Sequence, residues 1–428
     1  MRRGRKARPR QNQRPQLSAA GPSSTVVDTA LRFGNPLSTQ PSSLPLVPVP
    51  DDCVRNFPKP SIASTSEPDE DEIFMVRVPG KVTDDALDTV SLCVLYPAVK
   101  AALQTRRIIP LVTDKQRDGR YTIADVPGHG KGILATDNFA LGELILHERP
   151  LLVTPIIPPS CTLGSHTMED YTFWDALAKE LPDRNREALL DLFNCIPESS
   201  SSPGALDDII STNSLGIRLC PGQLGTHAAV GERASRINHS CSPNAHVHWN
   251  ADSFSIEVRA NRPIAKGDEI TVAYLDVLVP YHERQNDLQR KWRFSCACAA
   301  CSQPGPRESS DERREGFLIL HCFPAQDTLM DRWLASSDPS TTSPLKLYHI
   351  LAENLEQEKL YGPELWLPLC RQLVKAYCAV KDKLNARAWA EGAARFNFAF
   401  CGTDGGWPLV ASSPERTEWW GLRDKTSS

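Results

Sequence analysis

Three cysteines within six residues place the tightest constraint on how this chain can fold. They occur as Cys296-Ala-Cys298-Ala-Ala-Cys301, between polar flanks that include Arg293 and Gln303. Thiolates at this spacing can occupy three corners of a tetrahedral zinc site, and a closed structural site takes four ligands. A free trio of core cysteines is the alternative, but the polar flanks fit buried positions poorly. The spacing therefore predicts zinc, with the fourth ligand supplied from elsewhere in the chain.

Cysteine usage and charge narrow the class of protein. The sequence has 13 cysteines but no secretory leader, so we expect core thiols and metal ligands rather than a disulfide framework. No apolar run reaches the roughly 18 residues that span a bilayer. A net charge of −4 gives no general reason to expect nucleic-acid binding.

The first part of the chain has the composition of disordered sequence. Residues 1–72 are rich in proline and serine, begin with the basic run RRGRKARPR and end near the acidic run EPDEDE. Such sequence buries too little apolar surface to offset its ordering entropy. The basic run fits a solvated tail, a nuclear import signal or a basic contact patch, whereas its prolines disfavour a mitochondrial presequence. Residues 73–117 carry apolar clusters without a motif and stay unassigned.

Residue patterns in the remainder predict an α+β fold. Strand-like segments are YTIADV, KGILAT, GELILHE, PLLVTP, AHVHWN, FSIEVRA and DEITVAYL. Two short helices are predicted within residues 168–197 from apolar positions Phe173, Leu177, Leu181, Leu189, Leu192 and Phe193. Beyond Gln303 the pattern is helical, with one apolar face at Leu347, Ile350, Leu351 and Leu355 and another at Leu369, Leu373, Ala376 and Tyr377.

A second motif, RINHSCSPN at residues 236–244, contains the candidate for the fourth zinc ligand. Alone, Asn238, His239 and Ser240 could form a capped turn in which side chains bond the backbone. Cys241 changes this interpretation, because it can complete the tetrahedron if the CxCxxC segment folds back onto this loop. The candidate zinc ligands are therefore Cys241, Cys296, Cys298 and Cys301.

Two further motifs are weak evidence when taken singly. GDEITVAY at residues 267–274 indicates a turn and a strand that ends at Tyr274, which could also be a half-buried tyrosine with a partner for its hydroxyl. GHGKG at residues 128–132 indicates a glycine-rich turn between strands. No helix pattern follows it, so a phosphate-binding loop is disfavoured.

Taken together and in this order, the four motifs resemble the SET-domain lysine methyltransferases. GHGKGILA resembles the N-terminal glycine motif of that family, RINHSCSPN its Asn-His-Ser-Cys-x-Pro-Asn signature, and GDEITVAYLD its tyrosine strand. The segments YLDVLVPYHERQNDLQRKWRFSCACAAC and IISTNSLGI resemble the SMYD branch in particular. The resemblance covers roughly residues 119–303.

Two departures from the SMYD branch matter. SMYD proteins carry a cysteine-rich MYND zinc finger within the SET region, but the insert here holds only Cys161, Cys195 and Cys220, far apart. The chain therefore resembles a SMYD-related protein without a MYND finger. Where that branch often has a tyrosine two residues before the post-SET phenylalanine, this chain has Trp292 before Phe294. The position borders the lysine channel, so it bears on substrate choice and on the number of methyl groups added.

The resemblance implies a domain layout and an activity. We expect a SET domain of several small sheets at residues 118–282 with a helical insert at about 160–225, a zinc-binding post-SET segment at 283–303 and a helical C-terminal domain at 304–428. The implied activity is transfer of a methyl group from S-adenosylmethionine to a lysine side chain of a histone or another protein. A catalytically inactive SET-fold scaffold for protein interaction is the alternative.

The resemblance also implies site residues and partners. Residues expected to contact the cofactor are His129, Gly130, Lys131, Asn213, Asn238, His239, Tyr274 and Phe294. Tyr274 is the catalytic candidate, Trp292 borders the lysine channel, and zinc on the four cysteines is structural. We expect a monomer in the nucleus, the cytoplasm or both. Its partner is a protein that presents a lysine, and binding to a membrane or to nucleic acid is not required.

Overall fold

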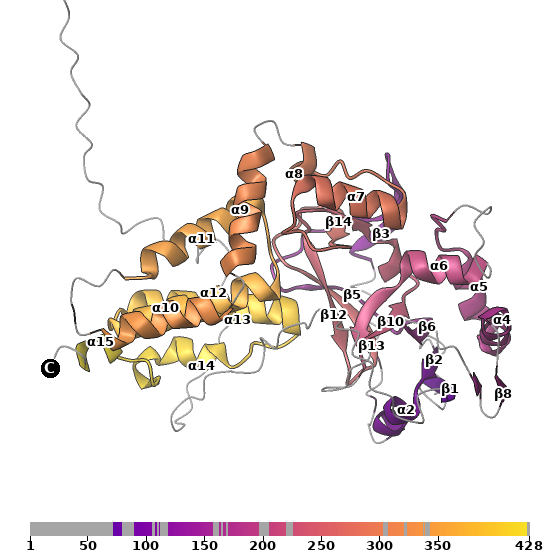
Figure 1. Ribbon diagram of the computed structural model, residues 1–428, viewed down its shortest axis with the longest axis horizontal. Coiled ribbons are helices and arrows are strands. Elements are labelled where there is room, and N and C mark those ends of the chain that lie inside the picture. The colour runs from indigo at the N-terminus through magenta and orange to yellow at the C-terminus, as the bar shows by residue number, and fades with distance from the viewer. Residues whose placement is uncertain are drawn as a thin grey trace, which may run out of the picture.

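The chain forms a β-rich part and a helical part (Figure 1). The computed structural model describes residues 72–78, 90–104, 108, 111, 119–156, 162–163, 166–167, 170–196, 205–219, 226–302, 307–320, 323–336, 338 and 343–425. The tail predicted over residues 1–72 lies outside them except for Glu72, which starts the first strand. Among the described residues, none of the helices combines the length and apolar character that crossing a bilayer requires.

The largest sheet has seven strands and takes in part of the unassigned N-terminal segment. Its order is β8 (His166–Thr167), β7 (Thr162–Leu163), β1 (Glu72–Val78), β2 (Ser91–Leu95), β6 (Leu152–Pro155), β10 (Thr226–Val230) and β9 (Leu215–Arg218). β2 runs antiparallel to β1 and parallel to β6, and every residue of β2 is buried. A continuous buried apolar run is typical of an interior strand. β2 is followed by α2 (Pro97–Gln104).

Of two smaller sheets, the four-stranded one carries the glycine, asparagine–histidine and tyrosine motifs. One has the order β11 (Asn238–His239), β14 (Glu269–Val272), β4 (Gly130–Ala135) and β3 (Tyr121–Val126), and the other has β12 (Ala245–Asn250), β13 (Ser255–Ala260) and β5 (Leu144–Glu148). All seven predicted strand-like segments contain strands. β11 lies parallel to β14, with His239 opposite Val272. This pairing brings the asparagine–histidine motif beside the strand that leads to Tyr274.

The described residues of the predicted insert form three helices: α4 (Asp170–Glu180), α5 (Asp183–Leu190) and α6 (Ala205–Asn213). The first two were predicted, and Phe173, Leu177 and Leu189 are buried as expected. Phe193 is different, because its side chain is 70% exposed. The helix ends before this residue, so helical spacing no longer decides which way Phe193 faces.

The chain from Tyr281 onward is mainly helical, as predicted for the residues after Gln303. Its helices are α7 (Tyr281–Trp292), α8 (Ala299–Ser302), α9 (Arg307–Leu320), α10 (Phe323–Ala335), α11 (Leu345–Glu358), α12 (Pro363–Ala379), α13 (Lys383–Cys401), α14 (Trp407–Ser412) and α15 (Leu422–Lys425). The predicted apolar face of α12 is fully buried. On α11, Leu351 and Leu355 are buried, whereas Ile350 at the border of the face is 42% exposed.

The helical part packs directly on the β-rich part. Leu278, in the segment between β14 and α7, is 5% exposed and belongs to the apolar core of the helical part. His246 of β12 meets Phe400 of α13 edge-on, with ring centroids 5.4 Å apart. Asn261 Nδ2 donates to the Tyr361 carbonyl at 3.2 Å. These contacts attach the helices to the small sheets, while the exact domain boundaries stay predictions.

Replacing Leu278 with alanine tests how much this shared core contributes. We expect the free energy of unfolding to fall by about 2–5 kcal/mol, because a buried leucine loses its transfer energy and leaves a cavity. Leu190→Ala is the matched control, since Leu190 is 55% exposed and should change stability by less than about 0.5 kcal/mol. Denaturant unfolding measures both, and equal effects would contradict the role of Leu278.

Candidate functional site

A cleft of about 690 Å³ lies where several separate segments of the chain meet. We call it the central cleft, and it is lined by the glycine turn (128–131), the insert (191–195, Thr212 and Asn213), residues 235–236, 238–239 and Tyr274, and the end of α7 with the residues after it (292–294 and Cys296). A volume of this size falls within the range of about 300–1,000 Å³ that is usual for small-molecule and cofactor sites.

The glycine turn needs glycine for two separate reasons. Gly128 and Gly130 have φ of +80° and +73°, in the left-handed region that side chains disfavour. Gly132 has ordinary φ, but a Cβ there would lie 2.7 Å from Asn238 Nδ2. The sequence GHGKG therefore allows both the turn and the close approach of β4 to the loop that carries Asn238.

Asn238 ties that loop to the neighbouring strands. Its Nδ2 donates to Glu269 Oε1 at 2.8 Å and to the Lys131 carbonyl at 3.3 Å. Glu269 also pairs with His129 Nδ1 at 3.2 Å. With its amide hydrogens engaged, Asn238 has its Oδ1 atom as the group that can accept from a ligand.

His239 is held as a neutral ring. Its Nδ1 accepts the backbone N–H of Tyr274 at 3.0 Å, and its Nε2 lies 3.3 Å from Cys241 Sγ. Burial lowers the pKa of His239 to about 4. Because Nδ1 is the acceptor, the single ring proton sits on Nε2 and points at the sulfur. One side chain thus joins Tyr274 to the cysteine cluster.

Tyr274 is fixed through both its backbone and its hydroxyl. The hydroxyl donates to the Ile237 carbonyl at 2.6 Å, which leaves the oxygen as an acceptor. Burial, and then the nearby Glu269, raise the pKa of Tyr274 well above its usual range. The hydroxyl therefore stays protonated near neutral pH and is unsuited to act as a general base.

Aromatic rings after α7 stand beside Tyr274 and His239. Arg293 ends the helix with φ of +61°, and this left-handed residue turns the chain back toward the cleft. The ring of Trp292 lies 5.2 Å from that of Tyr274, and Phe294 lies 6.2 Å from His239. Trp292 Nε1 donates to the Thr212 carbonyl at 3.2 Å, which attaches the insert to this wall.

The insert contributes one predicted residue and several that sequence reasoning missed. Asn213 Nδ2 donates to the Phe193 carbonyl at 2.7 Å and holds the loop after α5. Asp191 accepts from Arg236 and lies 3.8 Å from Lys131 Nζ, so it links two cations at the edge of the cleft. Also missed were the lining residues Leu192, Asn194, Cys195, Thr212 and Ser235. Arg236 stood within a quoted motif, but no local pattern marks Asp191.

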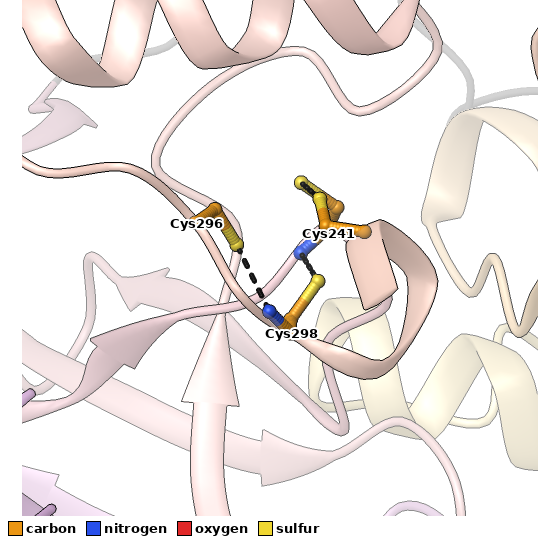
Figure 2. Close-up of side chains that lie close together, drawn as sticks. Cys241, Cys296 and Cys298 are labelled. Carbon is orange, nitrogen blue, oxygen red and sulfur yellow. Dashed lines mark hydrogen bonds between the residues drawn. The ribbon is translucent and has the colours of Figure 1, made fainter. Parts of the chain in front are cut away.

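All four predicted zinc ligands come together in one cluster, which reaches the cleft at Cys296. Figure 2 shows three of them, Cys241, Cys296 and Cys298. The sulfur atoms of Cys241, Cys296, Cys298 and Cys301 lie within 4.8 Å of one another. The Cys241–Cys301 distance is 3.6 Å, close to the edge of about 3.8 Å for a tetrahedron with zinc–sulfur bonds of about 2.3 Å.

The backbone and charges around the sulfurs also suit a cation. The N–H of Cys241 donates to Cys298 Sγ at 3.4 Å, and Gln285 Nε2 donates to Cys301 Sγ at 3.4 Å. Hydrogen bonding between the thiols raises the pKa of Cys241, chiefly through Cys296, and lowers the pKa of Cys298, chiefly through Cys241. The four thiols therefore cannot all ionise unless a cation compensates them, and this donor set fits zinc.

The central part of the chain, residues 130–275, matches the family model described as the SET domain. This chain contains a SET domain. The match begins at Gly130 in the glycine turn and ends just after Tyr274, so it spans the asparagine–histidine motif. The three cysteines of the CxCxxC segment follow the SET domain in sequence. Their sulfur atoms cluster with that of Cys241, which lies within the SET domain.

Several curated proteins are similar to this chain over part of their length. Histone-lysine N-methyltransferase set5 of Schizosaccharomyces pombe is 30% identical over 197 residues, which cover 46% of this chain and 55% of that protein. N-lysine methyltransferase SMYD2-B of Danio rerio is 30% identical over 126 residues, 28% of this chain and 29% of the relative. This chain thus spans about half the length of the first relative and under a third of the second.

A solved structure, that of the Neurospora SET domain protein DIM-5, a histone lysine methyltransferase, is also similar in part. It shows 19% identity and covers 41% of this chain and 55% of that chain, with a TM-score of 0.19. At this TM-score the two chains do not superpose as whole folds.

Zinc content is the first test of the cysteine cluster. We expect about one zinc per chain in the wild type and loss of most of it in Cys298→Ser, because a closed structural site needs all four ligands. Chelation should lower the melting temperature, since the metal contributes to folding. Elemental analysis and thermal unfolding measure these effects.

Cys195→Ser is the matched control. Cys195 lines the central cleft but lies outside the cluster, so this variant should keep its zinc. Full zinc content in Cys298→Ser would show that the cluster is not the metal site.

Proposed function

We propose that this chain is a methyltransferase that moves a methyl group from S-adenosylmethionine to a lysine side chain of a protein substrate. The observation that carries the proposal is Tyr274, which lines the central cleft beside Trp292 and keeps a protonated hydroxyl whose oxygen can accept. The names of the two relatives, a histone-lysine and an N-lysine methyltransferase, support the reaction class. Histone or other protein substrates, in the nucleus or the cytoplasm, belong to this proposal.

The central cleft has groups suited to such a cofactor. The glycine turn would offer backbone at His129, Gly130 and Lys131, where the two left-handed glycines keep Cβ atoms out of the way. Asn238 and Asn213 have their Nδ2 atoms engaged, so each would use its amide oxygen to accept from the cofactor. His239, Tyr274 and Phe294 supply the aromatic wall, and Phe294 suits stacking on a purine ring.

The residues of the cleft would align the reaction rather than take part covalently. S-adenosylmethionine, when bound, would supply an electrophilic methyl group on its sulfonium, and the residues of the cleft would hold a neutral lysine amine in line with it. Positioning of the reacting atoms then accounts for much of the rate. A lysine with a pKa of about 10.4 is mostly protonated in water, and a desolvated channel favours its neutral form. Trp292, 5.2 Å from Tyr274, would border that channel.

Cofactor binding tests the site directly. Calorimetric titration of the zinc-loaded protein with S-adenosylmethionine should show binding to one site. Asn238→Ala should weaken this binding by about tenfold or more, because it removes both an acceptor and the link to the glycine turn. Asn250→Ala, on β12 and outside the cleft lining, should bind like the wild type. A folded wild type that does not bind would favour the scaffold alternative.

The hydroxyl of Tyr274 is tested by Tyr274→Phe. We expect the methyl-transfer rate constant to fall by about 10²-fold or more, because an oriented dipole at the reacting centre is lost, while the cofactor dissociation constant changes little. Radioactive methyl transfer to a histone mixture or a lysate measures the rate.

Tyr377→Phe removes a hydroxyl bonded to His349 in the helical part and serves as the control, with an unchanged rate expected. Unaltered transfer by Tyr274→Phe would remove Tyr274 from the mechanism.

A further inference from the structure

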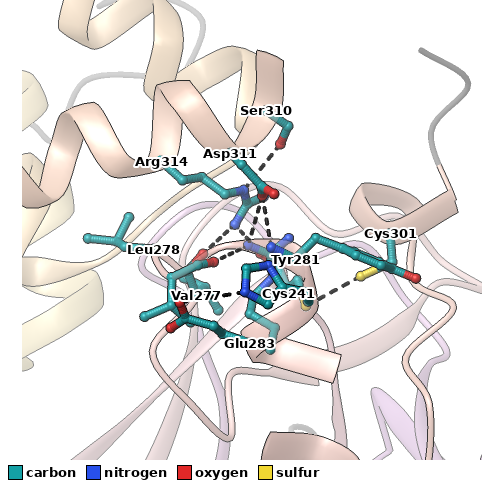
Figure 3. A network of polar contacts seen from close by, with 12 residues as sticks. Cys241, Val277, Leu278, Tyr281, Glu283, Cys301, Ser310, Asp311 and Arg314 are labelled. Atoms are coloured by element: carbon teal, nitrogen blue, oxygen red, sulfur yellow. Dashed lines mark hydrogen bonds and ion pairs between the residues drawn. The ribbon is translucent and has the colours of Figure 1, made fainter. Parts of the chain in front are cut away.

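Arg314 of α9 extends from the helical part to two loops of the β-rich part, one that contains Cys241 and one that contains Val277 (Figure 3). Its side chain is fully buried, and its Nη1 donates to the Val277 carbonyl at 2.6 Å and to the Cys241 carbonyl at 3.2 Å. A guanidinium carries five donors in a fixed plane, so one side chain can hold several acceptors in a defined arrangement. Arg314 thus fastens two separate loops to one helix.

Glu358 of α11 balances this buried charge. Its carboxylate lies 3.1 Å from Arg314 Nη2 and also accepts from Ser310 Oγ at 2.7 Å. The backbone carbonyl of Glu358 accepts the Ser242 hydroxyl at 2.8 Å. A buried charge destabilises unless it is paired and hydrogen-bonded, and here these conditions are met. The network fixes α9 and α11 onto the loop that contains Cys241.

The two loops held by Arg314 meet again at the central cleft. Cys241 follows His239 by two residues, Val277 follows Tyr274 by three, and His239 Nδ1 accepts the Tyr274 N–H at 3.0 Å. The contacts therefore form a closed ring, with the guanidinium at one side and the His239–Tyr274 pair at the other. The guanidinium bonds the residue that carries the Cys241 sulfur, and its other carbonyl partner, Val277, is three residues from Tyr274.

We propose that Arg314 is a positioning residue for methyl transfer. From the helical part, it sets the position of the loop that carries Cys241 relative to Tyr274. The inference rests on the proposed function and assigns to α9 a role in the geometry of the cleft. Apolar contacts such as that of Leu278 would hold the helical part in place without orienting these two carbonyls.

The neighbouring residue provides a matched control. Arg313 lies on the same helix and donates to the same carboxylate, with Nε 2.7 Å from Glu358 Oε1. In the described part of the chain, the polar contacts of Arg313 are with Glu358, and none is with the Cys241 loop or the Val277 loop. Arg313→Met therefore removes a comparable charge and ion pair while leaving the ring of contacts intact.

Zinc release tests the first half of the proposal without any need for activity. Full-length, zinc-loaded wild type, Arg314→Met and Arg313→Met are mixed with a chromogenic chelator, and the release rate is measured. We expect Arg314→Met to release zinc about tenfold faster or more, because the Cys241 and Val277 carbonyls lose the donor that they share and Glu358 loses one of its donors. Arg313→Met should stay within about twofold of the wild type. Equal rates in the two variants would overturn the proposal.

Calorimetry with S-adenosylmethionine tests the second half. A fraction of misfolded protein lowers the binding stoichiometry at constant affinity, whereas misplaced cleft walls raise the dissociation constant itself. We expect the dissociation constant to rise in Arg314→Met, to rise by less in Arg314→Lys, and to match that of the wild type in Arg313→Met. An unchanged dissociation constant in Arg314→Met would refute a positioning role.

Two further outcomes are separated by the design. Should Arg314→Met fail to fold, Arg314→Lys against Arg313→Lys makes the same comparison, because a lysine keeps the charge but cannot span both carbonyls. Faster zinc release in Arg314→Lys alone supports the proposal, and equal release overturns it. Absence of cofactor binding in the wild type would refute the proposed function. The zinc comparison would still decide whether Arg314 fixes the loop that carries Cys241.

Discussion

The convergence of four cysteine sulfurs is the constraint on which the site depends. Cys241 follows the asparagine–histidine motif, and the other three cysteines follow α7, so gathering their sulfurs within 4.8 Å folds the end of α7 back over that motif. Because Trp292 and Phe294 lie in this same segment, they come to line the central cleft. The thiols alone compete for protons, as the raised pKa of Cys241 and the lowered pKa of Cys298 indicate. A divalent cation resolves that competition, which is why this geometry suits zinc.

The hydrogen bonds around the cleft decide which atoms remain to act on a ligand. Asn213, Asn238 and Tyr274 all donate to protein acceptors, so each presents an oxygen that can accept. His239 is neutral and uses its ring nitrogens on Tyr274 and Cys241. Cations stand at the edge, where Asp191 holds Arg236 near Lys131. The cleft thus combines acceptors, aromatic faces and a rim of paired charges, and these features support the proposed binding of S-adenosylmethionine.

The helical part is bound to this site by buried contacts rather than by a linker alone. Leu278 lies in its apolar core, Asn261 bonds the Tyr361 carbonyl, and Arg314 bonds two SET-region carbonyls. Polar contacts of this kind tolerate little displacement, since a buried donor without its acceptor costs about 1–3 kcal/mol. The position of the helices and the shape of the cleft are therefore coupled.

The sequence by itself determined the features that depend on short spacing. The glycine turn, the seven strand-like segments and the CxCxxC trio could be predicted, because turn chemistry, alternation and metal-ligand spacing act within about ten residues. Cys241 lies far from the trio in sequence and was predicted only as the missing fourth ligand, from its place in a second motif. It also predicted that α12 buries one face, from Leu369 to Tyr377. Only the tertiary structure decided the partners of apolar β1 and β2, the exposure of Phe193, and the contacts of Asp191 and Arg314. Apolar segments do not specify which strand they pair with, and a charged residue carries no local sign of a partner more than 40 residues away, such as the one that Arg236 finds in Asp191.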